Sequence, residues 1–310
     1  MAHFPLYAGF ASLVLMAFAG RLRALAEGPW PALWTFGAVC AYAVTDEYHQ
    51  SFVPGRSSAL GDLALDAAGA ACAILIMTAI ARRRPAKRAL TEAGQAGFAR
   101  ADLLLPLLAG LLALLLYLPS LRNGFMPFWD DDDYVLKNAS VQALTWPSVK
   151  SWLTEPVHGN YAPLVLGSLA IDHALWGLDP AGYHLHNALL HALASGLLVW
   201  LLMSLRAPPL AAGVAGALYL VHPVQVESVA WISERKSLLA TIFLLLSFIV
   251  YARATRPAIA SRGGLWLSFL LFVAALLSKL SAVVLPGVFF LYDLGYRRAP
   301  LGRILREKVP

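Results

Sequence analysis

Long apolar runs separated by short polar stretches dominate the pattern along the chain. The runs do not alternate apolar and polar residues as barrel strands would, and most approach the roughly 20 residues that a spanning helix needs. The pattern therefore predicts an all-α, polytopic membrane protein with about nine transmembrane helices. We expect these helices near residues 5–20, 30–46, 60–81, 103–119, 184–205, 208–221, 237–252, 264–278 and 280–294.

Composition narrows the class further. Of the 310 residues, 59% are hydrophobic and only 14% are charged, whereas a soluble domain carries about 25% charged residues. This argues against a soluble α/β enzyme and against a disordered chain. Two cysteines are too few for a disulfide scaffold.

Charge asymmetry predicts the orientation in the membrane. With the long loop 120–183 outside, 17 of the 24 Lys and Arg residues fall on the cytoplasmic side. The acids and histidines gather on the opposite side, so we expect the chemistry on the extracytoplasmic face. The net charge of +6 then reflects cytoplasmic loops facing anionic lipid and calls for no nucleic acid.

One basic linker divides the chain. Residues 83–102 begin with Arg and Lys and continue with small and polar residues, as expected of a solvated cytoplasmic loop. We therefore predict a membrane module over 1–82 and a second over 103–310.

The first module carries a polar cluster at the outer end of a span. Its residues are Asp46, Glu47, Gln50 and Arg56, followed on the next span by Asp62 and Asp66, which share a helix face. Such carboxylates need a cation, and Arg56 is the nearest one. The cluster is either a buried polar clamp between hairpins or a small extracytoplasmic site.

The same residues resemble the VanZ-like family. The loop Asp-Glu-x-x-Gln-x-Phe-x-Pro-Gly-Arg and the Asp-bearing helix after it match that family's signature over about residues 1–82. The resemblance implies a role in the bacterial cell envelope and no defined reaction.

The second module opens with four adjacent carboxylates, Asp130 to Asp133, flanked by aromatic residues. Like charges this close favour protonation of one member or a bound cation. The cluster can serve as a general base or as a divalent-ion site, with Asp130 and Asp131 as the ligands of any metal. A solvated acidic loop is the alternative.

Further polar residues recur at outer helix ends. His184, Asn187 and His191 lie on one helix face, too widely spaced for one zinc ion, and predict a polar seam inside the bundle. Loop 142–183, with Trp146 and Trp152, suggests interfacial amphipathic helices. The segment from His222 through Glu227 and Glu234 to Arg235 and Lys236, together with Lys279, offers cations that suit a phosphate-bearing lipid.

The ordered motifs of residues 103–310 resemble the membrane part of the transmembrane and tetratricopeptide-repeat O-mannosyltransferases, glycosyltransferases of the GT-C architecture. The motifs are Phe-Trp-Asp-Asp at 128–131, Asn-Tyr-Ala-Pro-Leu at 160–164, Gly-Tyr-His at 182–184, Asn187, His191, His-Pro at 222–223, Glu227, Val-Ala-Trp at 229–231, Arg-Lys at 235–236 and Leu-Ser-Lys at 277–279.

This resemblance implies an inverting transfer from a polyprenyl- or dolichyl-phosphate sugar to a hydroxyl of a protein or envelope polymer. Asp130 and Asp131 would act as base or orient the acceptor, with Asp132 in reserve and Glu227 in support. Arg235 and Lys236 would hold the donor phosphate, with His184, Asn187, His191, His222 and Lys279 lining the substrate site. One carboxylate suffices for the proton transfer, so a divalent metal is optional and no other cofactor is expected.

Some features depart from this family. Ser237 stands where Asp or Asn usually follows the Arg-Lys pair, the six expected spans of this module are few, and the chain contains no tetratricopeptide repeats. The alternative function is a non-catalytic VanZ-like envelope protein of the bacterial inner membrane with an incomplete glycosyltransferase module. A transporter fits less well, because the acids lie at outer helix ends and not at the midplane.

Overall fold

The computed structural model describes residues 30–50, 64, 67–72, 74, 75, 78, 103–157, 159–256, 260–297, 302 and 304, with only the backbone at 31, over 45–50 and at 295. The chain forms two compact units, Met1–Gln95 with Pro286–Val309, and Ala96–Leu285. We describe each by itself. Every regular element of the described residues is helical, as the pattern predicts.

The unit that joins Met1–Gln95 to Pro286–Val309 contains α3 (Trp30–Gln50), α13 (Leu285–Leu291) and η7 (Tyr292–Arg297). In η7 the Arg297 side chain pairs with the buried Asp293 one turn before it, at 2.6 Å. The predicted span 30–46 corresponds to α3.

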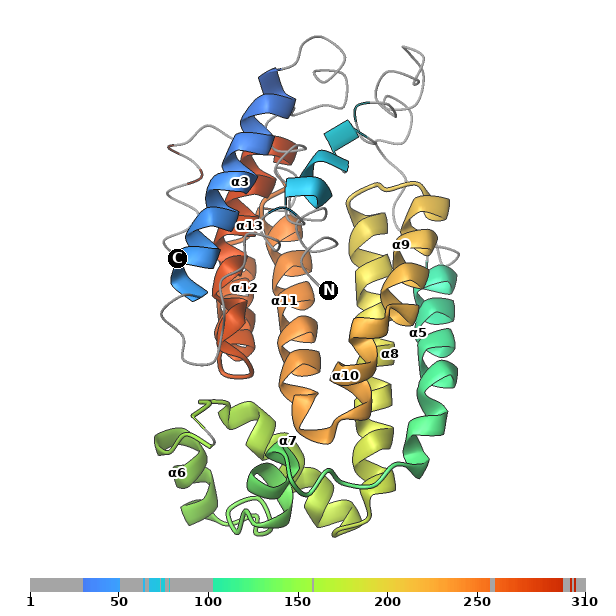
Figure 1. Ribbon diagram of the computed structural model, residues 1–310, viewed down its shortest axis with the longest axis vertical. Coiled ribbons are helices and arrows are strands. Elements are labelled where there is room, and N and C mark those ends of the chain that lie inside the picture. Colours follow the sequence, from blue (N-terminus) through green and yellow to red (C-terminus); the bar gives the residue numbers. More distant parts are fainter. Residues whose placement is uncertain are drawn as a thin grey trace. The chain divides into compact units, whose positions relative to one another are not determined.

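The larger unit, Ala96–Leu285, is a helical bundle built around α8 (Pro180–Ser204) (Figure 1). This helix contacts α5 (Leu104–Tyr117), α9 (Pro209–Val221), α10 (Pro223–Ala230) and α11 (Arg235–Ala254). On its other side α11 packs against α12 (Arg262–Leu276), where the hydroxyls of Ser247 and Ser268 each donate to the other's carbonyl oxygen. These paired bonds satisfy polar groups that an apolar helix interface would otherwise leave unpaired.

Helices α5 and α8 approach each other through glycines. A Cβ on Gly110 would lie 3.0 Å from the Ala192 carbonyl oxygen, and one on Gly196 would lie 3.0 Å from that of Pro106. The two glycines thus let the two backbones come into contact, which is the role that small residues play between helices in membranes.

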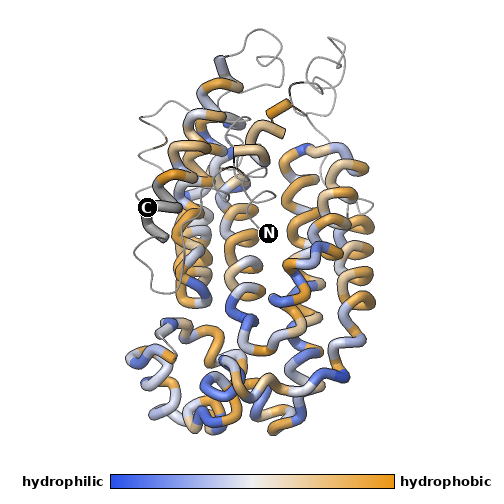
Figure 2. Tube along the Cα trace, in the orientation of Figure 1, coloured by the Kyte–Doolittle hydropathy of each residue, from blue (hydrophilic) through white to orange (hydrophobic). Residues whose placement is uncertain are grey.

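Four helical elements and the loops between them cap one end of this bundle. The cap contains η2 (Leu118–Arg122), η3 (Asp132–Leu136), α6 (Trp146–Thr154) and α7 (Pro163–Trp176). The hydrophilic stretches of this unit concentrate toward the capped end (Figure 2). The helix predicted around Trp146 and Trp152 is present as α6, and the Thr145 side chain caps it by accepting from the Ser148 amide.

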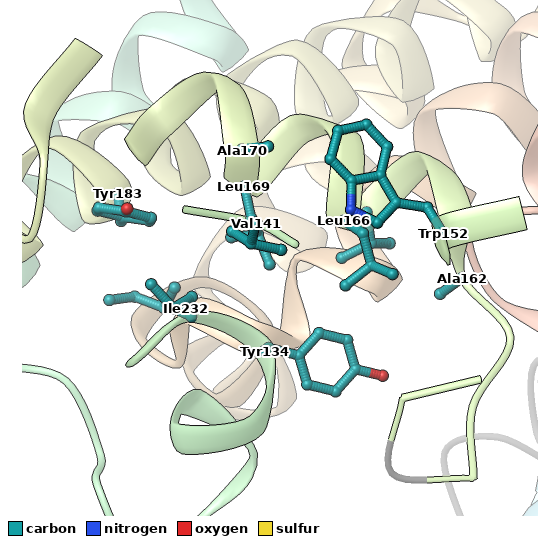
Figure 3. Close-up of a cluster of buried hydrophobic side chains, with 11 residues drawn as sticks. Tyr134, Val141, Trp152, Ala162, Leu166, Leu169, Ala170, Tyr183 and Ile232 are labelled. Carbon is teal, nitrogen blue, oxygen red and sulfur yellow. The ribbon is translucent and has the colours of Figure 1, made fainter. Parts of the chain in front are cut away.

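The cap has a hydrophobic core of its own, centred on Tyr134, Trp152, Leu166, Leu169 and Tyr183 (Figure 3). The indole Nε1 of Trp152 donates to the Ser140 carbonyl oxygen at 3.2 Å, so its polar edge is satisfied inside this core. Ile232, from the junction before α11, joins the same cluster. The core therefore fixes the cap to the end of α11, where the candidate site lies.

The expected spans that fall on described residues appear as helices, but few of these helices are long enough to cross a membrane alone. Among the described residues three qualify, Leu104–Arg122, Pro180–Ser204 and Ile232–Ala254, and a fourth if Pro209–Val221 and Pro223–Ala230, bent by 58°, form one span. The predicted span 264–278 is the 15-residue α12, and 280–294 divides into η6 (Leu280–Val284), α13 and η7. The predicted spans 5–20 and most of 60–81 lie outside the described residues.

Candidate active site

Asp131 ties the first loop of the cap to the break before α11. Its side chain is fully buried and accepts hydrogen bonds from two backbone amides, Met126 N–H at 2.9 Å and Ser233 N–H at 3.0 Å. These amides satisfy both carboxylate oxygens, so a buried charge is tolerated there. Asp131 thereby joins two segments about 100 residues apart and fixes the position of its neighbour Asp130.

Asp130 begins a chain of alternating charges. Its Oδ2 accepts from Nζ of Lys236 at 3.0 Å, and the same ammonium lies 3.1 Å from Oε1 of Glu234. The other oxygen of Glu234 meets Nζ of Lys279 at 3.2 Å and the Ser237 hydroxyl at 2.5 Å. Two carboxylates and two ammonium groups thus stand in one connected cluster, which we call the charge chain.

Two aromatic rings lie close to the Lys236 ammonium group. Its Nζ lies 5.4 Å from the centre of the Tyr134 ring and 5.7 Å from that of Trp231, distances at which a ring face attracts a cation. Trp129 packs edge-on against Trp231 at 5.0 Å. Burial raises the pKa of the Tyr134 phenol, and Lys236 opposes this effect only in part. The phenol therefore stays neutral beside the charge chain.

The neighbouring Arg235 has a separate set of partners and is 1% exposed. Its Nη1 pairs with Asp172 Oδ2 at 2.5 Å, its Nε donates to Asn187 Oδ1 at 2.7 Å and its Nη2 donates to the Tyr183 carbonyl oxygen at 3.0 Å. Asp172 also contacts the His186 ring. The Arg235 charge is therefore matched inside the protein, and its contacts are those of an anchor between α7, α8 and α11.

The predicted polar seam on α8 is buried, and each member meets different partners. Asn187 Nδ2 donates to the carbonyl oxygens of Val229 and Trp231 at 3.2 Å, which holds α8 to the break between α10 and α11. His184 Nε2 lies 3.5 Å from the Gly124 carbonyl oxygen. His191 packs between the rings of Tyr117 and Tyr219. Only Asn187 touches the charged groups, through Arg235.

Three other predicted residues lie apart from the charge chain. Asp132 pairs with Lys137 at 2.5 Å, a contact that raises the pKa of this exposed lysine. His222 caps α10 by accepting from the Val224 amide through Nδ1. Glu227 is exposed, and its carboxylate makes no hydrogen bond or ion pair with any residue the structure describes. The helix that carries it ends at Ala230, and Glu234 lies beyond this break, next to the lysines.

Sequence reasoning missed Asp172. The signal was present, since a single acid stands in the apolar run Pro163–Trp176, and such a group needs a buried cation. Ser237 departs from the family motif, and its hydroxyl donates to Glu234 and accepts from Lys279 at 2.7 Å.

The donor set gives little support to a metal. Within the described residues no three His, Cys, Asp or Glu side chains come close enough to hold one ion. The carboxylate of Asp131 is occupied by amides and that of Asp130 by an ammonium group. The described residues therefore do not form a metal site.

The polar residues of the first module cannot be placed in this way. Arg56, Asp62 and Asp66, and the side chains of Asp46, Glu47 and Gln50, lie outside the described residues.

The chain is similar to two different groups of known proteins. Residues 1–81 match a family model described as VanZ/LLP1. The chain is also similar to curated proteins named Protein O-mannosyl-transferase. Tmtc1 of Drosophila melanogaster is 33% identical over 207 residues, 64% of this chain and 23% of the fly protein. Tmtc2 of the same organism is 34% identical over 59% of this chain and 21% of its own length.

Human TMTC4 is 30% identical over 61% of this chain and 29% of its own length. The chain thus spans between a fifth and a third of the length of these relatives. No solved structure matches it. The two resemblances seen in the motifs are confirmed as similarities to these two groups of proteins.

Proposed function

We propose that the chain is an inverting glycosyltransferase that moves a sugar, most simply mannose, from a polyprenyl phosphate to a protein hydroxyl. The similarity to O-mannosyl-transferases over about 60% of the chain carries this proposal. The charge chain supports it, because carboxylates and ammonium groups are the groups that such a transfer requires.

The geometry suggests a division of labour. Asp130 has 18% of its side chain exposed, whereas Asp131 is fully buried. Asp130 therefore accepts the proton of the acceptor hydroxyl as that oxygen attacks the anomeric carbon. The bond from this carbon to the phosphate oxygen breaks, and the lipid phosphate leaves with the electron pair. Lys236 and Lys279 stabilise the charge that develops on it.

Asp131 and Arg235 then act by positioning. Asp131 is fully buried and saturated by two amides, so it holds Asp130 and does not itself take a proton. The phosphate role predicted for Arg235 stays a prediction, and its contacts with Asp172 and Asn187 favour an anchoring role instead. His184 and His191 would shape the interior behind the site.

A transfer assay tests the function. The purified chain in nanodiscs receives radiolabelled mannosyl polyprenyl phosphate and a Ser/Thr peptide, and we expect mannose on the peptide. Asp130→Asn should lower the rate by about 10²- to 10⁴-fold, the usual contribution of a general base. Asp133→Asn, the same change at an exposed neighbour, should leave the rate unchanged. Equal rates for both variants, or no transfer by the parent chain, would contradict the proposal.

We further propose nine spans in a bacterial inner membrane, with the cap on the extracytoplasmic face. The distribution of Lys and Arg supports this orientation. The VanZ/LLP1 match over residues 1–81 supports an envelope role.

The same match favours one alternative, a non-catalytic envelope protein. That function predicts polyprenyl phosphate binding without transfer, and binding that survives Asp131→Asn. The two functions therefore give opposite results in the mannose assay.

A further inference from the structure

Glu234 sits where an anionic ligand would be expected. Its carboxylate lies 3.1 Å from the Lys236 ammonium and 3.2 Å from the Lys279 ammonium, and it accepts from the Ser237 hydroxyl at 2.5 Å. Two ammonium groups and a hydroxyl converging on one set of oxygens are also the donors that suit a phosphate group.

Lys236 and Lys279 have other contacts that hold them in place besides those with Glu234. Lys236 is held by Asp130 at 3.0 Å and by the Tyr134 and Trp231 rings. Lys279 donates to the Ser237 hydroxyl at 2.7 Å. Removal of the Glu234 carboxylate would therefore leave both cations near their present places.

Position in the fold also favours an anion here. Glu234 directly precedes α11, and the positive end of this 20-residue helix faces the cluster. Glu234 makes no capping hydrogen bond with α11, so its carboxylate is committed to the side-chain donors. Lys279 is 37% exposed, which gives a ligand access from outside.

Charge balance explains why the carboxylate must give way. The positive charges of Lys236 and Lys279 are matched by Asp130 and Glu234, and Arg235 is matched by Asp172. A phosphate group that arrived beside an intact Glu234 would meet a like charge within a few ångströms. Rotation of the Glu234 side chain away from the lysines removes this repulsion. It also leaves the two ammonium groups and the Ser237 hydroxyl free to bind the phosphate.

We propose that Glu234 is an internal anion that holds the phosphate position between Lys236 and Lys279, and that a phosphate ester binds there by displacing it. The proposed function supplies only the identity of the lipid that carries the phosphate, and the inference rests on it to that extent. It assigns to Glu234 a role in regulating access to the site, which differs from a support for catalysis.

Binding of undecaprenyl phosphate to the full chain in neutral phosphatidylcholine nanodiscs tests this inference. Glu234→Gln keeps the size of the side chain and removes the competing charge, so it should lower the Kd by about tenfold. Lys279→Met should raise the Kd by a similar factor. Glu155→Gln, the same change at an exposed acid of the cap, should leave it unchanged. Glu234→Ala gives a second variant should the amide disturb folding, which circular dichroism would reveal.

The direction of the change decides the outcome. If Glu234 merely held the lysines in place, its loss would weaken binding, so a raised or unchanged Kd in folded variants would overturn the inference. Failure of every variant to bind would overturn it too. A parallel titration with inorganic phosphate distinguishes a free ion from a lipid headgroup, and tighter binding of either probe by Glu234→Gln supports the displaced anion.

The two proposals fail separately. Tighter lipid binding by Glu234→Gln without any mannose transfer by the parent chain would leave the inference standing and remove the enzyme function. Mannose transfer by the parent chain combined with weaker lipid binding by Glu234→Gln would support the enzyme function and overturn the inference about Glu234.

Discussion

At the scale of single residues, two adjacent cations take opposite environments. Arg235 is enclosed by protein groups, and Lys236 belongs to the charge chain and lies beside two aromatic rings. Consecutive helical residues point about 100° apart, so neighbours in the chain need not share a site. An arginine also suits a buried anchor, because its fixed fork of donors can bind several acceptors at once.

The Arg235 anchor predicts a large cost for losing its partner. Asp172→Asn leaves a buried guanidinium without its carboxylate and should reduce the free energy of unfolding by about 3–5 kcal/mol. Denaturant titration in detergent measures this. The double variant Asp172→Leu with Arg235→Met should cost less, because no buried charge is left unpaired. A loss no greater than that of the exposed Asp133→Asn would refute the anchoring role.

At the scale of elements, breaks in the helices bring the chemical groups together. The chain turns at Trp231, so η4 (Ile232–Glu234) places the Ser233 amide on Asp131 and the Glu234 carboxylate between two lysines. A continuous helix would have aligned Glu227 with Glu234, whereas the break leaves Glu227 exposed. Sequence periodicity could predict the helices on either side of the break. The carbonyl groups at the break accept hydrogen bonds from Asn187 of α8, a contact about 40 residues away in sequence that local periodicity does not contain.

The close contact of α5 with α8 predicts that a larger side chain between these helices lowers the stability of the protein. In Gly196→Leu the new side chain meets the Pro106 backbone, because a Cβ at position 196 lies 3.0 Å from the Pro106 carbonyl oxygen. The helices must separate, and we expect a loss of roughly 1–3 kcal/mol in unfolding free energy. Gly37→Leu in α3 is the matched control, since no described atom lies within 4 Å of that Cβ. Equal thermal stability of the two variants in detergent would argue against the contact.

At the scale of the whole molecule, orientation is the main prediction. In a background lacking Cys40 and Cys72, a cysteine at Ala139 in the cap should react with a membrane-impermeant maleimide from outside intact cells. A cysteine at Ala89 in the basic linker should react only after the cells are opened, since that segment is predicted to be cytoplasmic. Labelling of the two positions in the opposite order would reverse the topology.

By itself the sequence determined the helical class, most helix positions and the two resemblances, because apolar run length and short motifs are local properties. It also marked Asp130, Asp131, Lys236 and Lys279 as candidates. Only the tertiary structure decided which of these meet, because ion pairs such as Asp130 with Lys236 and Asp172 with Arg235 join residues far apart in the chain. Burial separates the anchor Arg235 from the accessible Lys279, and burial follows from how helices pack and not from residue type.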